Sequence, residues 1–177
     1  MFKPSEIVSQ KLLVTTAGVD MAKVLEKFNK DEKHLLAMGK FKIDGKSAKL
    51  VLEGDLTTNG VAENKWSNPT TGKTNTTCAV GIALSDEDLE FFESCQTTLG
   101  QLVGDDYELT TLVKNDIIYL KVKDKKVFNA MSNVKADKLF HGQKFATTVE
   151  FKFYINLKDE KAGVVLHPVK YVFEETD

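Results

Sequence analysis

Residues 144–157 read KFATTVEFKFYINL, and apolar side chains recur at every second position of this stretch. One side of the extended chain would carry Phe145, Val149, Phe151, Phe153, Ile155 and Leu157. The other side would carry Lys144, Thr148, Glu150, Lys152, Tyr154 and Asn156. A period of two predicts a long strand with one buried face and one polar face.

The rest of the C-terminal third also has the pattern of sheet. Residues 107–113 and 117–123 alternate around a short polar turn, and they predict a hairpin. Residues 164–173 form the expected closing strand, in which Pro168 indicates a sheet edge or a bulge.

A second hairpin is predicted near the N-terminus. Residues 38–43 and 48–52 alternate around a turn signal at 44–47. A two-residue turn would place Lys40 directly opposite Lys49, and like charges in that position are unfavourable. We therefore predict a four-residue loop, although either turn places the lysines of both strands on one face.

Helical spacing occurs in two places. Residues 86–103 follow a potential cap at Ser85, begin with acidic residues and repeat apolar side chains every three or four positions. Residues 19–29 show a weaker helical pattern. Between the two, residues 63–75 (ENKWSNPTTGKTN) predict a surface loop that holds Trp66, the only tryptophan.

The charges are unevenly distributed over the 177 residues. All 24 basic residues are lysine, and the net charge is −2. Residues 74–113 contain eight acids and no lysine, whereas the segments on either side each carry 12 lysines and nine acids. Because arginine is the preferred side chain for bidentate recognition, its absence argues against a sequence-specific DNA reader.

Signatures of catalysis, metal binding and cofactor binding are missing from the sequence. The three histidines are far apart, Cys78 and Cys95 lack CxxC spacing, and the carboxylates show no metal-ligand pattern. Residues 68–74 end in Gly-Lys-Thr but lack the first glycine and the following helix of a phosphate-binding loop. We expect no enzyme, metal or cofactor, with convergence of distant residues on a β-barrel as the alternative.

A binding surface is the hypothesis that this leaves. Ammonium groups follow phosphates and aromatic rings stack on bases in single-stranded nucleic-acid grooves. The candidate residues, mostly on predicted outer strand faces, are Lys40, Lys42, Lys49, Trp66, Tyr119, Lys121, Lys123, Lys144, Lys152 and Tyr154. The alternative is that these lysines only keep exposed strands soluble.

From residue 107 onward the sequence resembles the OB-fold single-stranded DNA-binding proteins of phages and large DNA viruses. The likeness lies in residues 117–123 (IIYLKVK), 141–145 (HGQKF), 163–166 (GVVL) and 171–173 (YVF). It implies a basic, aromatic-bearing groove. It also implies an acidic C-terminal end that recruits replication proteins or masks the groove, here residues 174–177 with Glu174, Glu175 and Asp177.

These observations combine into one prediction. We expect a mainly β (α+β) fold, a single domain over residues 1–177, with an OB-like five-stranded barrel, an inserted helix and an N-terminal hairpin. It would bind single-stranded DNA, or RNA, without sequence preference during replication or recombination. The second hypothesis is a viral structural or assembly protein with a β-sandwich fold. With neither a signal segment nor an apolar span, an intracellular protein is expected, with the acidic helix as one candidate surface for homo-oligomers.

Overall fold

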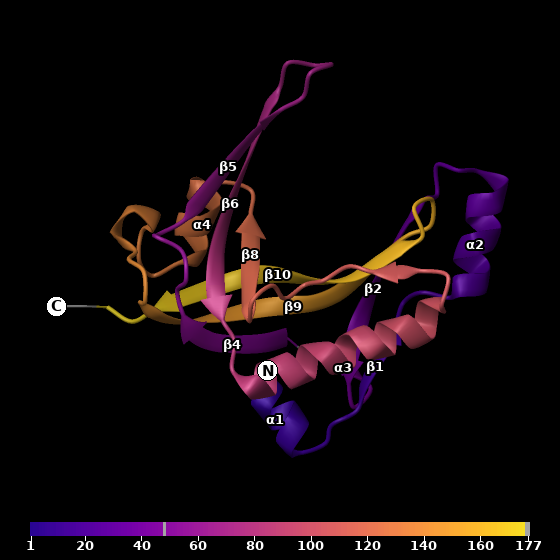
Figure 1. Ribbon diagram of the computed structural model, residues 1–177, viewed down its shortest axis with the longest axis horizontal. Coiled ribbons are helices and arrows are strands. Elements are labelled where there is room, and N and C mark those ends of the chain that lie inside the picture. The colour runs from indigo at the N-terminus through magenta and orange to yellow at the C-terminus, as the bar shows by residue number, and fades with distance from the viewer. Residues whose placement is uncertain (48, 176–177) are drawn as a thin grey trace. The chain divides into compact units, whose positions relative to one another are not determined.

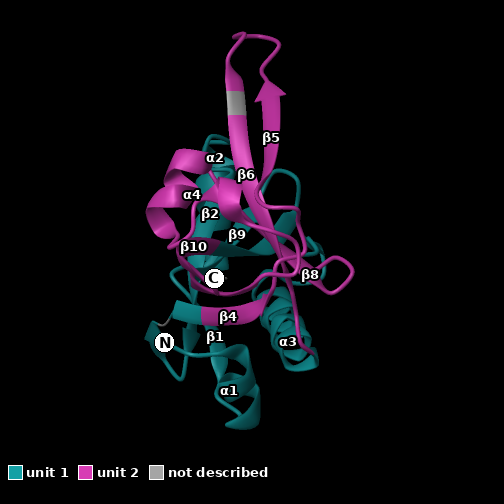
Figure 2. Ribbon diagram, turned by 90° about the vertical axis from the view of Figure 1, so that its left-hand side faces the viewer, with its two compact units in different colours: residues 1–50, 86–112, 150–166 teal, residues 51–85, 113–149, 167–177 magenta. Residues whose placement is uncertain are grey.

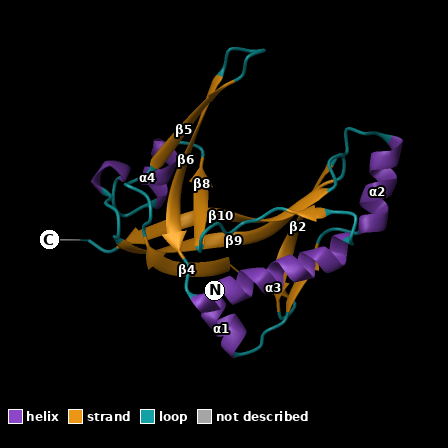
Figure 3. Ribbon diagram, viewed as in Figure 1, coloured by secondary structure: helices purple, strands orange, loops and turns teal. Residues whose placement is uncertain are grey.

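The computed structural model describes residues 1–47 and 49–175. It is mainly β, with 43% strand and 25% helix, which is consistent with an OB-like α+β fold. The helices of the described residues are α1 (Pro4–Ser9), α2 (Met21–Lys30), α3 (Asp86–Val103), α4 (Lys125–Met131) and the short 3₁₀ helix η1 (Ala136–Lys138) (Figure 3). The fold class predicted from the sequence is confirmed.

Ten strands are present in the described residues. They are β1 (Val14–Ala17), β2 (Leu36–Ile43), β3 (Lys46–Ser47), β4 (Lys49–Asp55), β5 (Ala62–Ser67), β6 (Thr74–Ala83), β7 (Glu108–Leu109), β8 (Ile117–Val122), β9 (Lys144–Asn156) and β10 (Lys161–Phe173) (Figure 1). One sheet has the order β1-β2-β9-β10-β7, with β3 paired to β2 and β4 to β9, and the second has the order β5-β6-β8. The short strands β1 and β7 lie at the two ends of the first sheet.

The chain divides into two compact units that alternate along the sequence (Figure 2). Unit 1 contains residues 1–50, 86–112 and 150–166. Unit 2 contains residues 51–85, 113–149 and 167–177. Three of the five boundaries fall inside β4, β9 and β10, and each unit is described by itself below. Across the described residues, no helix is both long enough and apolar enough to span a membrane.

Unit 1 is built around the buried faces of β2 and β9. Phe41, Phe151 and Phe153 are at most 3% exposed, and they alternate with polar residues as the sequence predicted. Helix α3 spans the predicted residues, and its Phe91 packs against Phe151 with ring centroids 5.6 Å apart. Helix α2 is also confirmed, and Asp20 caps its N-terminus: the Asp20 carboxylate accepts the backbone N–H of the second helical residue.

The N-terminal turn differs from the prediction. Lys42 lies opposite Ser47 and Ile43 opposite Lys46, so the turn contains only Asp44 and Gly45. Both have positive φ, 50° and 75°, which is the conformation that two-residue hairpins favour. The predicted four-residue loop is wrong because the strand that begins at Lys49 pairs with β9 rather than with β2. Ala48, part of that prediction, lies outside the described residues.

Unit 2 corrects two further predictions. The predicted loop over residues 63–75 is mostly strand, since β5 and β6 pair from Ala62 opposite Ala79 to Ser67 opposite Thr74. The hairpin predicted for residues 107–123 is also wrong, because β8 pairs with β6. In the connection after β8, Phe128 is 1% exposed and packs beside Tyr171, as expected for a core residue. Phe140, in the same connection, is 44% exposed.

Candidate nucleic-acid interface

Four of the predicted lysines come together in unit 1. Lys40 and Lys42 lie on the polar face of β2, Lys49 begins β4, and Lys152 lies on the polar face of β9. Lys40 is directly opposite Lys152 in the antiparallel register. Side chains in that position have their Cβ atoms about 5 Å apart. We call Lys40, Lys42, Lys49 and Lys152 the lysine cluster.

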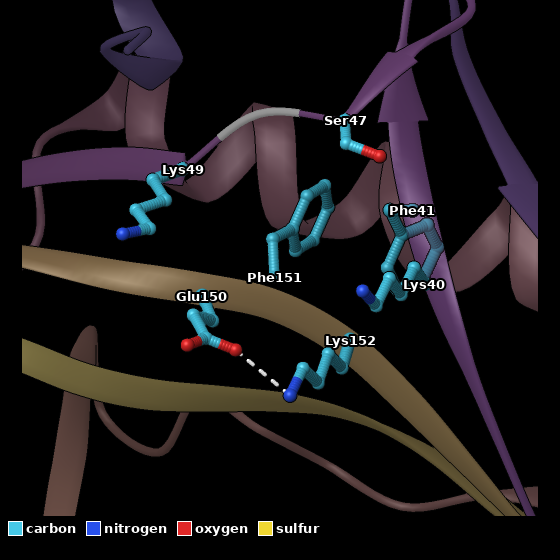
Figure 4. A pocket seen from close by; sticks show the side chains of 7 residues that line it. All are labelled: Lys40, Phe41, Ser47, Lys49, Glu150, Phe151 and Lys152. Atoms are coloured by element: carbon cyan, nitrogen blue, oxygen red, sulfur yellow. Dashed lines mark ion pairs between the residues drawn. The ribbon is translucent and has the colours of Figure 1, made fainter.

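A hollow of about 280 Å³ opens where β2 leaves β9. The pairing of these strands ends at Lys40 opposite Lys152, and beyond this point β2 pairs with β3 instead. Lys40, Lys49 and Lys152, from three different strands, surround the hollow together with Ser47 and Glu150 (Figure 4). The stacked rings of Phe41 and Phe151, with centroids 4.3 Å apart, also line it. The buried aromatic rings of Phe41 and Phe151 therefore lie beside the three lysines that line the hollow.

The electrostatic balance of the lysine cluster is positive. Lys152 Nζ lies 2.8 Å from Glu150 Oε2, so one of the four ammonium groups has a carboxylate partner. In the described part of the chain, Lys40, Lys42 and Lys49 form no ion pair. Three lysines and one glutamate line the hollow and leave two positive charges around it, and Lys42 adds a third positive charge to the cluster. This arrangement favours an anionic ligand.

A second hollow, of about 530 Å³, shares Lys40 and Lys152 with the first. Its lining includes Lys42 and Met38, whose side chain is 47% exposed. Met38 lies opposite Tyr154, one rung along from the pair Lys40 and Lys152 on the same face. The exposed apolar side chain of Met38 therefore lies next to the pair Lys40 and Lys152, and the flat face of a base can lie on such a surface.

Tyr154 has a packing role at this edge of unit 1. Its hydroxyl lies 2.9 Å from Thr110 Oγ1, and the side chain is partly buried. A Cβ atom added to Gly163 would come within 2.8 Å of the Tyr154 ring. The ring therefore covers a glycine of β10, and its hydroxyl is held by Thr110. Tyr154 is on the predicted face but is not a free stacking platform.

The other predicted aromatic residues lie in unit 2, on the sheet of β5, β6 and β8. The register places Trp66, Tyr119 and Lys121 on one face, which we call the aromatic face. Trp66 is 57% exposed and Tyr119 is 45% exposed. Trp66 pairs with residue 75 and Tyr119 with Gly81, so the rings are about 20 Å apart along β6. They cannot sandwich one base, but each offers a separate platform.

The remaining predicted residues have other surroundings in unit 2. Lys123 follows β8 in a bend and is exposed. Lys144 lines a hollow that also contains Glu53, Asp55 and Glu174. Three acidic residues therefore line the same hollow as Lys144, and among the described residues no other lysine lines it.

The first residue of the acidic C-terminal end, Glu174, forms hydrogen bonds to residues at the start of β9. Glu174 donates its backbone N–H to the carbonyl of Lys144 at 2.8 Å and accepts from the Gln143 side-chain amide at 2.8 Å. Glu175 is exposed and lines a hollow with Lys135 and Lys138. Asp177 lies outside the described residues. Glu174 is therefore part of the folded sheet rather than the start of a free tail.

The two cysteines are poor nucleophiles in this structure. Cys78 and Cys95 are both 0% exposed. Burial raises the pKa of each thiol, and Glu63 raises that of Cys78 further. Since the thiolate is the reactive form, neither residue is suited to covalent catalysis.

Sequence reasoning missed two residues of the interface. Met38 falls on the lysine side of the alternating segment, and the period of two could have identified it. Glu150 occupies the same face of β9 as Lys152, two residues away, which is the signal for their ion pair. Comparisons of the chain with protein-family models, with curated proteins and with solved structures found no match.

Proposed function

We propose that this chain binds single-stranded DNA without sequence preference, and that it does so without catalysis. The observation that carries the proposal is the lysine cluster, in which ammonium groups from three strands surround one hollow. Three of the four cations have no acidic partner among the described residues. A role in covering strands that are exposed during replication or recombination follows from this activity.

The chemistry of lysine supports backbone contacts rather than base reading. An ammonium group is a compact charge on a flexible stem, so it can follow phosphates in many geometries. The cluster contains no guanidinium group, because the chain has no arginine. The commonest specific contact in DNA recognition is a pair of hydrogen bonds from arginine to guanine. Here lysine would have to make that contact, and it is less suited to do so.

The exposed apolar side chain beside the lysines supports a nucleic-acid strand over a free phosphate. Met38, which is 47% exposed, lies two residues along β2 from Lys40 on the same face. A nucleotide has a phosphate and a base a few ångströms apart, and the face presents charge and apolar surface in that order. In unit 2, Trp66 and Tyr119 offer additional surfaces for base stacking.

Fluorescence anisotropy with labelled oligonucleotides tests the proposal. We expect oligo-dT and a mixed-sequence DNA strand to bind with similar affinity, and the same sequence as duplex to bind more weakly. The affinity for the strands should fall steeply as salt rises, because bound lysines release counterions from the phosphates. A parallel titration with oligo-rU determines whether the sugar matters.

Two results would overturn this function. The absence of any complex with either strand at low salt would leave the lysines as solubilising residues and favour the assembly-protein hypothesis. Tighter binding of the duplex than of its separated strands would show that the cluster recognises double-helical DNA.

A further inference from the structure

Strand β5 has one unpaired edge. It is the terminal strand of the three-stranded sheet, and among the described residues only β6 pairs with it. All six of its residues are exposed. Residues 74–77 of β6 pair with β5 but not with β8, so the hairpin continues beyond β8 as a two-stranded ribbon (Figure 1). An exposed strand edge of this kind can accept a further strand.

The hydrogen-bond pattern shows which backbone groups face outward. Asn68 donates its N–H to the carbonyl of Lys73 at 2.8 Å, just beyond the pair Ser67 and Thr74. Because hydrogen-bonded pairs alternate along an antiparallel ladder, Ala62, Asn64 and Trp66 direct their backbone groups toward β6. Glu63, Lys65 and Ser67 therefore direct theirs toward the open edge.

The charges on this edge are complementary to those of a second copy of β5 in antiparallel orientation. If two copies of β5 pair antiparallel about Asn64, Glu63 of each copy lies opposite Lys65 of the other. Both residues have outward backbone groups, so this register also makes the ladder hydrogen bonds. A shift by two residues would place Lys65 opposite Lys65 or Glu63 opposite Glu63, and like charges in that position are unfavourable.

We propose that β5 forms an antiparallel pair with β5 of a second copy of this chain, centred on Asn64. Two Glu63 to Lys65 pairs lie on one face of the joined strands. On the other face, Trp66 of each copy packs against Ala62 of its partner. Six residues a side make a small interface, so the dimer is weak and depends on protein concentration.

Sedimentation velocity over a range of concentrations tests the pairing with a charge swap. Wild type should associate as concentration rises. K65E should weaken association roughly tenfold, because two opposite-charge pairs become two like-charge pairs. E63K should do the same, and the double variant E63K/K65E should restore association near the wild-type level.

The design separates the interface from effects within one chain. Glu63 lies 4.0 Å from Lys125, so E63K alone also alters a contact inside its own unit. A folding defect from either single change would persist in the double variant, whereas the proposed pairing is repaired. K73E, in the loop beyond β5, is the control and should associate like wild type. A monomeric wild type at every concentration, or a double variant as weak as the singles, would overturn the proposal.

Discussion

The lysine cluster of unit 1 and the aromatic face of unit 2 carry similar sequence patterns in different environments. Strands β2, β8 and β9 alternate polar residues with buried apolar ones, whereas all six residues of β5, which carries Trp66, are exposed. The lysine cluster contains four cations, and the neighbouring Tyr154 is held in packing contacts. The aromatic face presents two exposed rings and one lysine. Charge and stacking surface are therefore supplied mainly by different parts of the chain.

Two tyrosines show the difference most clearly. Tyr154 and Tyr119 both occupy the outer face of a strand and both lie over a glycine. Tyr154 donates to or accepts from Thr110 through its hydroxyl, whereas Tyr119 is 45% exposed with its ring on Gly81. The same residue type in the same pattern has a structural role in one region and an open face in the other.

Glycine substitutions should produce the largest effect and should differ between the two regions. A Cβ atom at Gly39, beside the lysine cluster, would overlap the buried Phe153 ring and the Ala17 carbonyl. G39A should lower the free energy of unfolding by about 3 kcal/mol, because neither neighbour can move easily. G81A on the aromatic face would meet the Thr57 hydroxyl, which makes no hydrogen bond in the described structure and can rotate. It should cost about 1 kcal/mol in urea denaturation. Equal losses would contradict the difference in packing.

Substitutions of Tyr154 should lower the stability of the protein more than the corresponding substitution of Tyr119. Y154A should lower the free energy of unfolding by about 2 kcal/mol, because it removes both the ring over Gly163 and the Thr110 hydrogen bond. Y154F should lose about 1 kcal/mol from the hydrogen bond alone. Y119A should lose less than about 1 kcal/mol, since its ring is half exposed. A Y154F protein as stable as wild type would show that Thr110 does not hold this tyrosine.

The aromatic face should contribute to DNA affinity. Y119A or W66A should each weaken oligo-dT binding about tenfold in anisotropy titrations, a loss within the range for one stacked base. F140A is the matched control, because Phe140 is a similarly exposed aromatic residue of the same unit outside this face. Unchanged affinity in both variants would remove the aromatic face from the interface.

Single lysines should give the smallest effects. K40Q should weaken oligo-dT binding roughly fivefold at about 0.1 M salt, as expected for one phosphate contact. K144Q should change affinity far less, because Glu53, Asp55 and Glu174 line the same hollow as Lys144. If K144Q matched K40Q, the carboxylates around Lys144 would not exclude a strand from it.

The sequence predicted elements whose signals are local. The period of two assigned the faces of β9, and the spacing of apolar residues together with the acidic first turn predicted α3. It also identified Lys40, Lys42, Lys49 and Lys152 as surface residues of strands. The rule that like charges avoid each other gave a wrong turn at Asp44 and Gly45, because it assumed that β2 and β4 are partners.

The pairing of strands is the feature of the fold that the sequence predicted least well. Nothing local shows that β8 pairs with β6 rather than with residues 107–113, since the choice depends on contacts between distant segments. For the same reason, the sequence predicts a loop where β5 lies: the polar residues of β5 lack a buried face, and its pairing with β6 makes it a strand. The meeting of Lys49 with Lys40 and Lys152 around one hollow also follows from such pairing.

The salt dependence of oligo-dT binding tests the central claim most directly. In K40Q/K49Q/K152Q, the slope of log affinity against log salt should become shallower by about 2, because each phosphate contact of a single strand contributes about 0.7. K11Q/K23Q/K33Q removes the same charge from exposed positions elsewhere in unit 1 and should keep the wild-type slope. Equal slopes in the two triple variants would contradict the assignment of the lysine cluster as the strand-binding site.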